Sequence, residues 1–128
     1  MQILAALFLD DIEIRQVPGP STRIDLTGIG FSVPAPSAPP VTLEPHLVVI
    51  VHCRPDERGT GALEVTYHLD GGQVARNVQP IEVEPGKFTY RLVRAELEFD
   101  RYGTIEAHCR IDLGDPTIVP FTLLPPVS

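Results

Sequence analysis

The chain has 128 residues, of which 43% are hydrophobic and 21% are charged. This length and composition fit one globular domain spanning 1–128, and they exclude an intrinsically disordered chain. The formal net charge of −7, from 10 basic and 17 acidic residues, argues against a surface for nucleic acid or for an anionic membrane. No basic segment precedes the first apolar run, so we predict no signal peptide and expect the protein to stay in a reducing compartment such as the cytoplasm.

Apolar residues alternate along most of the chain with a period of two, which is the pattern of β-strands. The 14 prolines and 10 glycines separate the alternating segments. In chain order, the predicted strands cover 2–9 with a continuation to Ile14, 23–33, 46–54, 62–69, 73–84, 88–99, 104–113 and 117–124. A break in alternation at Val93 and Arg94 divides the segment 88–99, and the sequence at 70–72 (DGG) predicts a tight hairpin turn.

The positions of proline limit which strands can be central. Pro80 and Pro120 cannot donate a backbone hydrogen bond, so we predict that the strand with Pro120 lies at a sheet edge and that the strand with Pro80 lies at an edge or contains a bulge. The segment PAPSAPP at 34–40 is predicted to be a stiff crossover between sheets or an exposed arm. Together, about eight strands with frequent turn signals predict an all-β protein, specifically an antiparallel β-sandwich of immunoglobulin-like type. A β-barrel is the second interpretation.

The tripeptide His-Cys-Arg occurs at 52–54 and again at 108–110, and the two copies contain both cysteines of the chain. Neighbouring residues of a strand point to opposite faces, so one metal ion cannot bind the His and the Cys of the same copy. We predict that Cys53 and Cys109 are buried thiols of the core, with a disulfide as the alternative. The two histidines of these copies are predicted to be solvent-facing neighbours on adjacent strands.

Other residue combinations give little support to catalysis or ligand binding. No serine lies in a GxSxG motif and no glycine-rich loop opens a helix, so we predict neither enzymatic activity nor a cofactor. Acidic residues in or near the turns would bind calcium if several gathered at one end of the molecule, although turn formation also explains them. Tyr67, Tyr90 and Tyr102 could line a sugar-binding face or pack within the sheets.

A longer pattern covers nearly the whole chain. A first strand ends in an acidic pair, a second strand contains two glycines, and a proline-rich crossover leads to a hydrophobic strand (LFLDDIEIR…IDLTGIGFSVPAPSAPPVTLEPHLVVIVHCR). With the C-terminal segment YGTIEAHCRIDLGDPTIVPFTLLP, this pattern resembles a family of small bacterial and phage-encoded β-sandwich proteins of unknown function. The resemblance implies an immunoglobulin-like sandwich without enzymatic activity, and it assigns no catalytic residues.

These observations predict a non-enzymatic structural or interaction module that acts as a subunit of a larger assembly. Its partners would be proteins, either further copies of the chain or the subunits of a phage capsid that it would decorate as a minor component of the virion. Docking through edge strands or extended segments is predicted for the residues Pro34, Pro36, Pro39, Pro40, Phe121, Leu123 and Leu124. A bacterial module that binds carbohydrate or calcium is the alternative.

Overall fold

The computed structural model describes residues 1–16 and 22–127. Strands account for 66% of the structure and the described residues form no helix, so the predicted all-β class is confirmed. In particular, these residues contain no helix long and apolar enough to cross a membrane.

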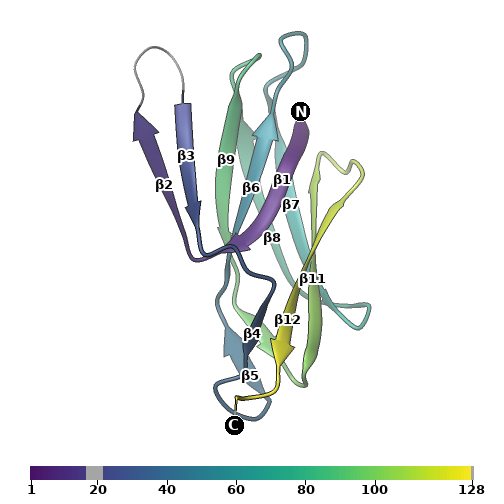
Figure 1. The fold of residues 1–128 in the computed structure, drawn as a ribbon. Helices are drawn as coiled ribbons and strands as arrows, with labels where there is room; N and C mark the ends of the chain where they lie inside the picture. The colour runs from purple at the N-terminus through teal and green to yellow at the C-terminus, as the bar shows by residue number, and fades with distance from the viewer. Residues whose placement is uncertain (17–21, 128) are drawn as a thin grey trace.

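The described residues form twelve strands, which Figure 1 shows in chain order. Their bounds are β1 Gln2–Leu9, β2 Asp11–Gln16, β3 Thr22–Thr27, β4 Ser32–Pro34, β5 Val41–Leu43, β6 His46–His52, β7 Thr60–Leu69, β8 Gly72–Glu82, β9 Phe88–Arg94, β10 Leu97–Phe99, β11 Gly103–Ile111 and β12 Thr117–Leu124. The larger number of strands arises because three predicted segments are divided and because β5 was not predicted. The segment 23–33, for example, is interrupted at Gly28, which has a left-handed backbone conformation (φ 72°).

The strands pair into two larger sheets and two pairs. One sheet has the order β1-β6-β9, and the other has the order β4-β12-β11-β7-β8. β10 pairs with β5, and β2 pairs with β3. All of these pairs are antiparallel except β4 and β12, which are parallel, so the prediction of purely antiparallel pairing is wrong for that pair.

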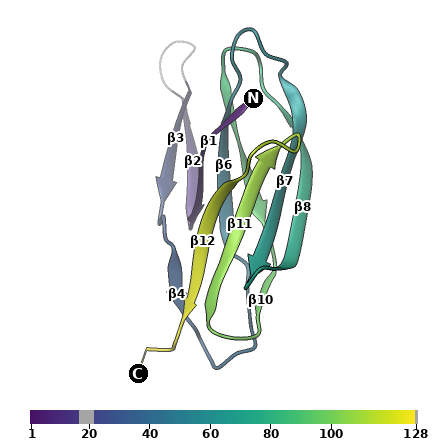
Figure 2. The ribbon, with the colours of Figure 1, turned by 90° about the vertical axis from the view of Figure 1, so that its right-hand side faces the viewer.

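The hydrophobic core lies between the three-stranded and the five-stranded sheets. Figure 2 shows these sheets side by side, with the hairpin β2–β3 on the other side of the three-stranded sheet. Buried side chains come from both sheets, and the largest that are fully enclosed include Tyr67, Phe8, Phe99 and Leu47. Alternation along each strand therefore supplies one inward-facing row of apolar side chains, as the period of two requires.

The prolines occupy the positions that their chemistry allows. Pro80 lies in β8, the outermost strand of the five-stranded sheet, as predicted. Pro120 lies in a part of β12 that has no paired strand on its outer side, because β4 pairs only with the last three residues of β12. The segment 34–40 leads from β4 to β5, and Ala35 is buried there and donates its N–H to the carbonyl oxygen of Leu124 (2.8 Å). The segment therefore connects two strands, and all of its other residues except Pro39 are exposed to solvent.

Candidate functional site

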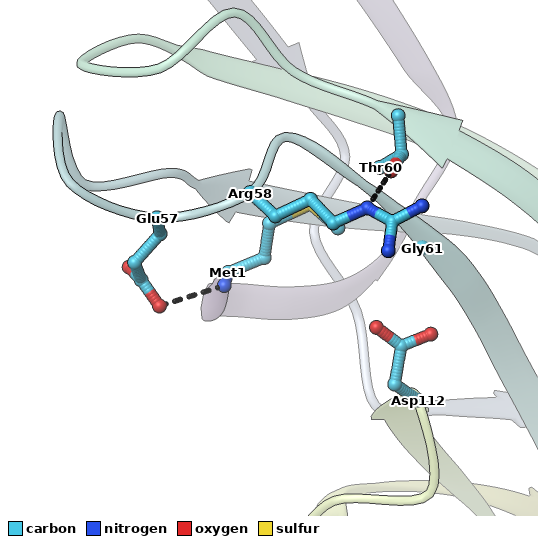
Figure 3. Close-up of a pocket in the computed structure, with 6 residues that line it drawn as sticks. All are labelled: Met1, Glu57, Arg58, Thr60, Gly61 and Asp112. Atoms are coloured by element: carbon cyan, nitrogen blue, oxygen red, sulfur yellow. Dashed lines mark hydrogen bonds and ion pairs between the residues drawn. The ribbon is translucent and has the colours of Figure 1, made fainter.

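A pocket of about 660 Å³ opens at one end of the molecule, beside the first residue of β1 (Figure 3). Its lining residues are Met1, Glu57, Arg58, Thr60, Gly61 and Asp112. Glu57 Oε2 accepts a hydrogen bond from the amino group of Met1 (3.0 Å), and Glu57 Oε1 accepts one from the N–H of Arg54 (3.1 Å). These two bonds, the first being the stronger influence, hold the pKa of Glu57 below its usual value.

Asp112 forms another wall of this pocket, and the backbone fixes its position. Its N–H donates to the carbonyl oxygen of Ala62 (3.0 Å), and its Oδ1 accepts from the N–H of Ala62 (2.9 Å). The carboxylate lies close to Gly61, since a Cβ atom at this position would be 2.7 Å from Asp112 Oδ2. This arrangement could not be predicted from local pattern, because the pairing of β7 with β11 brings residues 61 and 112 together.

Charged side chains line much of this pocket. Arg58 Nε donates to Thr60 Oγ1 (2.8 Å), so the only hydroxyl of the lining is bonded to a cation and not to a general base. The Arg58 guanidinium and the Asp112 carboxylate both face the open space (Figure 3). The pocket can therefore hold a charged or polar group of another molecule by ion pairing and hydrogen bonding.

A second pocket, of about 180 Å³, is mostly apolar and lies where β1 ends beside β4 and β12. Its lining residues are Phe8, Leu9, Asp10, Gly28, Gly30, Ser32, Val33, Pro45 and Phe121. Two hydrogen bonds hold the segment between β3 and β4 at this place: Gly30 N–H to the carbonyl oxygen of Phe8 (3.0 Å) and Thr122 N–H to that of Phe31 (2.8 Å). They fix a rigid rim on which Ile29 and Phe31 are 46% and 57% exposed.

The predicted docking residues differ in their exposure to solvent. Pro34, Pro36 and Pro40 are exposed, and Pro39 is half-buried. Leu124 is 41% exposed, and the half-buried ring of Phe121 packs on that of Phe8 with a centroid distance of 5.0 Å. Leu123 is 1% exposed, so the prediction was wrong for this residue, which belongs to the inward-facing row of β12. We name Ile29 and Phe31 the apolar edge surface.

The sequence analysis missed Ile29 and Phe31, although a signal was present. These two large apolar residues flank Gly30 in the segment GIGF, which we assigned to the interior of a strand. Gly28 instead ends β3, and Ser32 begins β4, so both residues lie in the connection between strands. An apolar residue in a connection between strands has no neighbouring strand to cover it, which leaves both side chains exposed.

The two cysteines are buried and free, as predicted. Burial raises the pKa of the Cys109 thiol to about 12. Cys53 donates weak hydrogen bonds to the carbonyl oxygens of Arg54 (3.5 Å) and Glu57 (3.7 Å). Neither thiol is therefore an exposed nucleophile.

The two histidines of the His-Cys-Arg copies are not neighbours, contrary to the prediction, because β6 and β11 belong to different sheets. The ring of His108 lies against that of His68 instead, with a centroid distance of 4.3 Å. His68 Nε2 is bonded to Thr66 Oγ1 (2.9 Å), and His108 Nε2 lies 3.6 Å from Glu106 Oε1. In the part of the chain that the structure describes, no group of three or more His, Cys, Asp or Glu side chains is arranged to hold a metal ion.

The acidic residues are instead distributed among arginines. Glu64 accepts hydrogen bonds from Arg76 (2.8 and 3.0 Å) and Arg110 (2.6 Å), and these bonds lower the pKa of its carboxyl group. Asp70 and Asp100 both bind Arg101. The predicted sugar-binding face is not formed by all three tyrosines, because Tyr67 is fully buried in the core.

Comparison with known proteins gives no relative for this chain. No protein-family model, curated protein or solved structure matches it. The resemblance to small phage and bacterial β-sandwich proteins therefore stays an expectation.

Proposed function

We propose that the protein is a non-enzymatic interaction module that acts as a subunit of a larger protein assembly. The observation that carries this proposal is the apolar edge surface, where Phe31 is 57% exposed on a rim fixed by backbone hydrogen bonds. Full burial of a Phe side chain stabilises a structure by about 1.5–3 kcal/mol, so a partner that covers Phe31 and Ile29 gains a substantial part of its binding energy there.

We also propose that the two larger sheets form an immunoglobulin-like sandwich. The shared core between them supports this fold, as does the position of β4 as a short strand at one edge. The outer side of β4 pairs with no strand in the described residues. An extended segment of a partner could add to this edge and place its apolar side chains on Phe31 or Leu124.

A phage capsid is one concrete form of such an assembly. The protein would bind across neighbouring coat subunits as a decoration or minor virion protein, with the apolar edge surface in the contact. Its size and all-β fold suit this role, and the support is by analogy only. The unreactive thiols and the hydrogen-bonded hydroxyl of Thr60 are consistent with a role without catalysis.

The test is binding of purified protein to particles isolated from its source, with matched variants. Phe31→Asp changes the apolar edge surface, whereas Val78→Asp introduces the same charge at an apolar residue of β8 that is 48% exposed. We expect wild type and Val78→Asp to bind alike, and Phe31→Asp to lose at least about 10-fold in affinity, as for a central hydrophobic contact. Equal binding of all three proteins, or no binding by wild type, would contradict the proposal.

A further inference from the structure

The hairpin β2–β3 is paired only with itself. Its alternation places Ile12, Ile14, Ile24 and Leu26 on one face and charged residues on the other. Ile14 is 56% exposed. A two-stranded hairpin is at best marginally stable in water unless its apolar face is covered or further strands extend it. The free edge of β2 is therefore a place where another strand would add stability.

A second free edge belongs to β9, the outermost strand of the three-stranded sheet. Just before this strand, Cys53 donates its N–H to the carbonyl oxygen of Lys87 (3.0 Å), which marks residues 53 and 87 as a hydrogen-bonded pair. In an antiparallel ladder such pairs alternate with pairs whose backbone groups point outward. The N–H and C=O groups of Phe88, Tyr90 and Leu92 therefore point to the free edge of β9.

The same reasoning gives the free groups of β2. The N–H of Ile12 donates to Asp11 Oδ1 (2.8 Å), which favours an Ile12–Leu26 pair without backbone hydrogen bonds. Alternation then directs the backbone groups of Ile14 to the free edge of β2 as well. On both strands, the residues that can bond a new neighbour are those with apolar side chains.

These two edges match in an antiparallel register. When Ile14 lies opposite Tyr90 and Ile12 lies opposite Leu92, the outward backbone groups meet, and apolar side chains share one face. The same register places Glu13 opposite Arg91. Displacement of β2 by two residues in one direction would instead place Arg15 opposite Arg91, and like charges directly opposite are destabilising.

Glu13 and Arg91 are both available for this contact. Among the described residues neither forms an ion pair, and Arg91 donates only to Thr89 Oγ1 (3.5 Å) and the carbonyl oxygen of Tyr90 (3.0 Å). Asp25, which lies opposite Glu13 in the hairpin, already forms ion pairs with Arg15 and Arg23. The charges of the two edges are thus complementary at the position that the register selects.

We propose that two copies of this chain form a dimer in which β2 of each copy adds antiparallel to β9 of the other, with Glu13 paired to Arg91. Figure 1 shows the hairpin on the same side of the molecule as β9, with β2 as its outer strand. Such a dimer has a two-fold axis, as most homodimers do, and each copy contributes the same two strands to it. This contact uses neither Phe31 nor Leu124, so the dimer can fail while the proposed function stands, and the reverse.

The test is the native mass of the full chain by sedimentation equilibrium over a range of concentrations. The chain has a mass of 14.0 kDa, and we expect wild type to associate to twice that value. Glu13→Arg and Arg91→Glu should each weaken the dimer at least about 10-fold, because each places like charges opposite one another. The variant with both substitutions should return to within about 3-fold of wild type, since the pair is restored with its charges exchanged. Arg101→Glu, an equal change of charge in the turn before β11, should leave association unchanged.

Far-UV circular dichroism on every variant separates loss of the dimer from loss of the fold. Recovery of association by the double charge exchange, with each single variant folded, establishes the contact. A wild-type protein that stays at 14.0 kDa up to millimolar concentration overturns the proposal. A dimer that both single variants leave intact also overturns it, because the contact must then lie elsewhere.

Discussion

The hydroxyl group of Tyr67 provides a sharp test of the described core. The ring is fully buried on β7, opposite Ala107 of β11, and its oxygen has no hydrogen-bond partner among the described residues. Burial raises the pKa of this phenol, and the nearby Cys109 thiol adds to the effect. A buried polar group without a partner costs about 1–3 kcal/mol. Tyr67→Phe removes only the oxygen and keeps the packing of the ring, so we expect it to raise the free energy of unfolding by about 1 kcal/mol.

The assay is unfolding by urea and by heat, followed by circular dichroism. An entropy of unfolding of about 2.1 cal/mol/K per residue converts 1 kcal/mol into a rise in Tm of roughly 4 °C for a chain of this length. Tyr102→Phe is the control, since Tyr102 is 39% exposed and its hydroxyl can bond water. A loss of more than about 0.5 kcal/mol in Tyr67→Phe would refute the reasoning, because the hydroxyl would then have a partner worth keeping.

Three further substitutions or measurements test other parts of the structure. A Cβ on Gly59 would lie 1.9 Å from the carbonyl oxygen of Val83, so Gly59→Ala should destabilise the protein by at least about 2 kcal/mol in urea unfolding, whereas Gly30→Ala, with open space around it, should cost far less. With a pKa of about 12, Cys109 in the Cys53→Ser variant should react with a disulfide reagent at pH 8 only after unfolding; rapid reaction of the folded protein would contradict its burial. Because the pKa of Glu64 is lowered in the folded protein, its carboxylate stabilises the fold at pH values above the ordinary pKa of 4.5, and this stabilisation is lost as the pH falls through the folded pKa. The loss of unfolding free energy caused by Glu64→Gln should therefore become smaller in acid. A loss that does not change with pH would contradict the contacts with Arg76 and Arg110.

The features that depend on local pattern could be predicted from the sequence. Alternation placed Cys109 in the core, and the missing N–H of Pro80 placed its strand at an edge. The features that depend on long-range pairing could not be predicted. The parallel pairing of β4 with β12 sets the surroundings of Phe31, and the pairing of β7 with β11 brings Asp112 to Gly61. Nothing in the spacing of those residues along the chain indicates such contacts.

The neighbours of His108 show the same limit. Sequence identity between the two His-Cys-Arg copies suggested a relation between His52 and His108, yet strand order decides which side chains meet. His68 lies against His108 because it stands in β7, the strand next to β11. A repeated tripeptide predicts similar local environments, such as the burial of both cysteines, but not a shared site.

Hydrogen–deuterium exchange on the protein, free and assembled with particles from its source, tests the central claim most directly. We predict that amides within 28–34 and 120–124 exchange more slowly in the assembled state, because a partner covers the apolar edge surface. Unchanged exchange in both segments, with protection confined to other strands or absent throughout, would contradict the claim that this surface is where the protein docks.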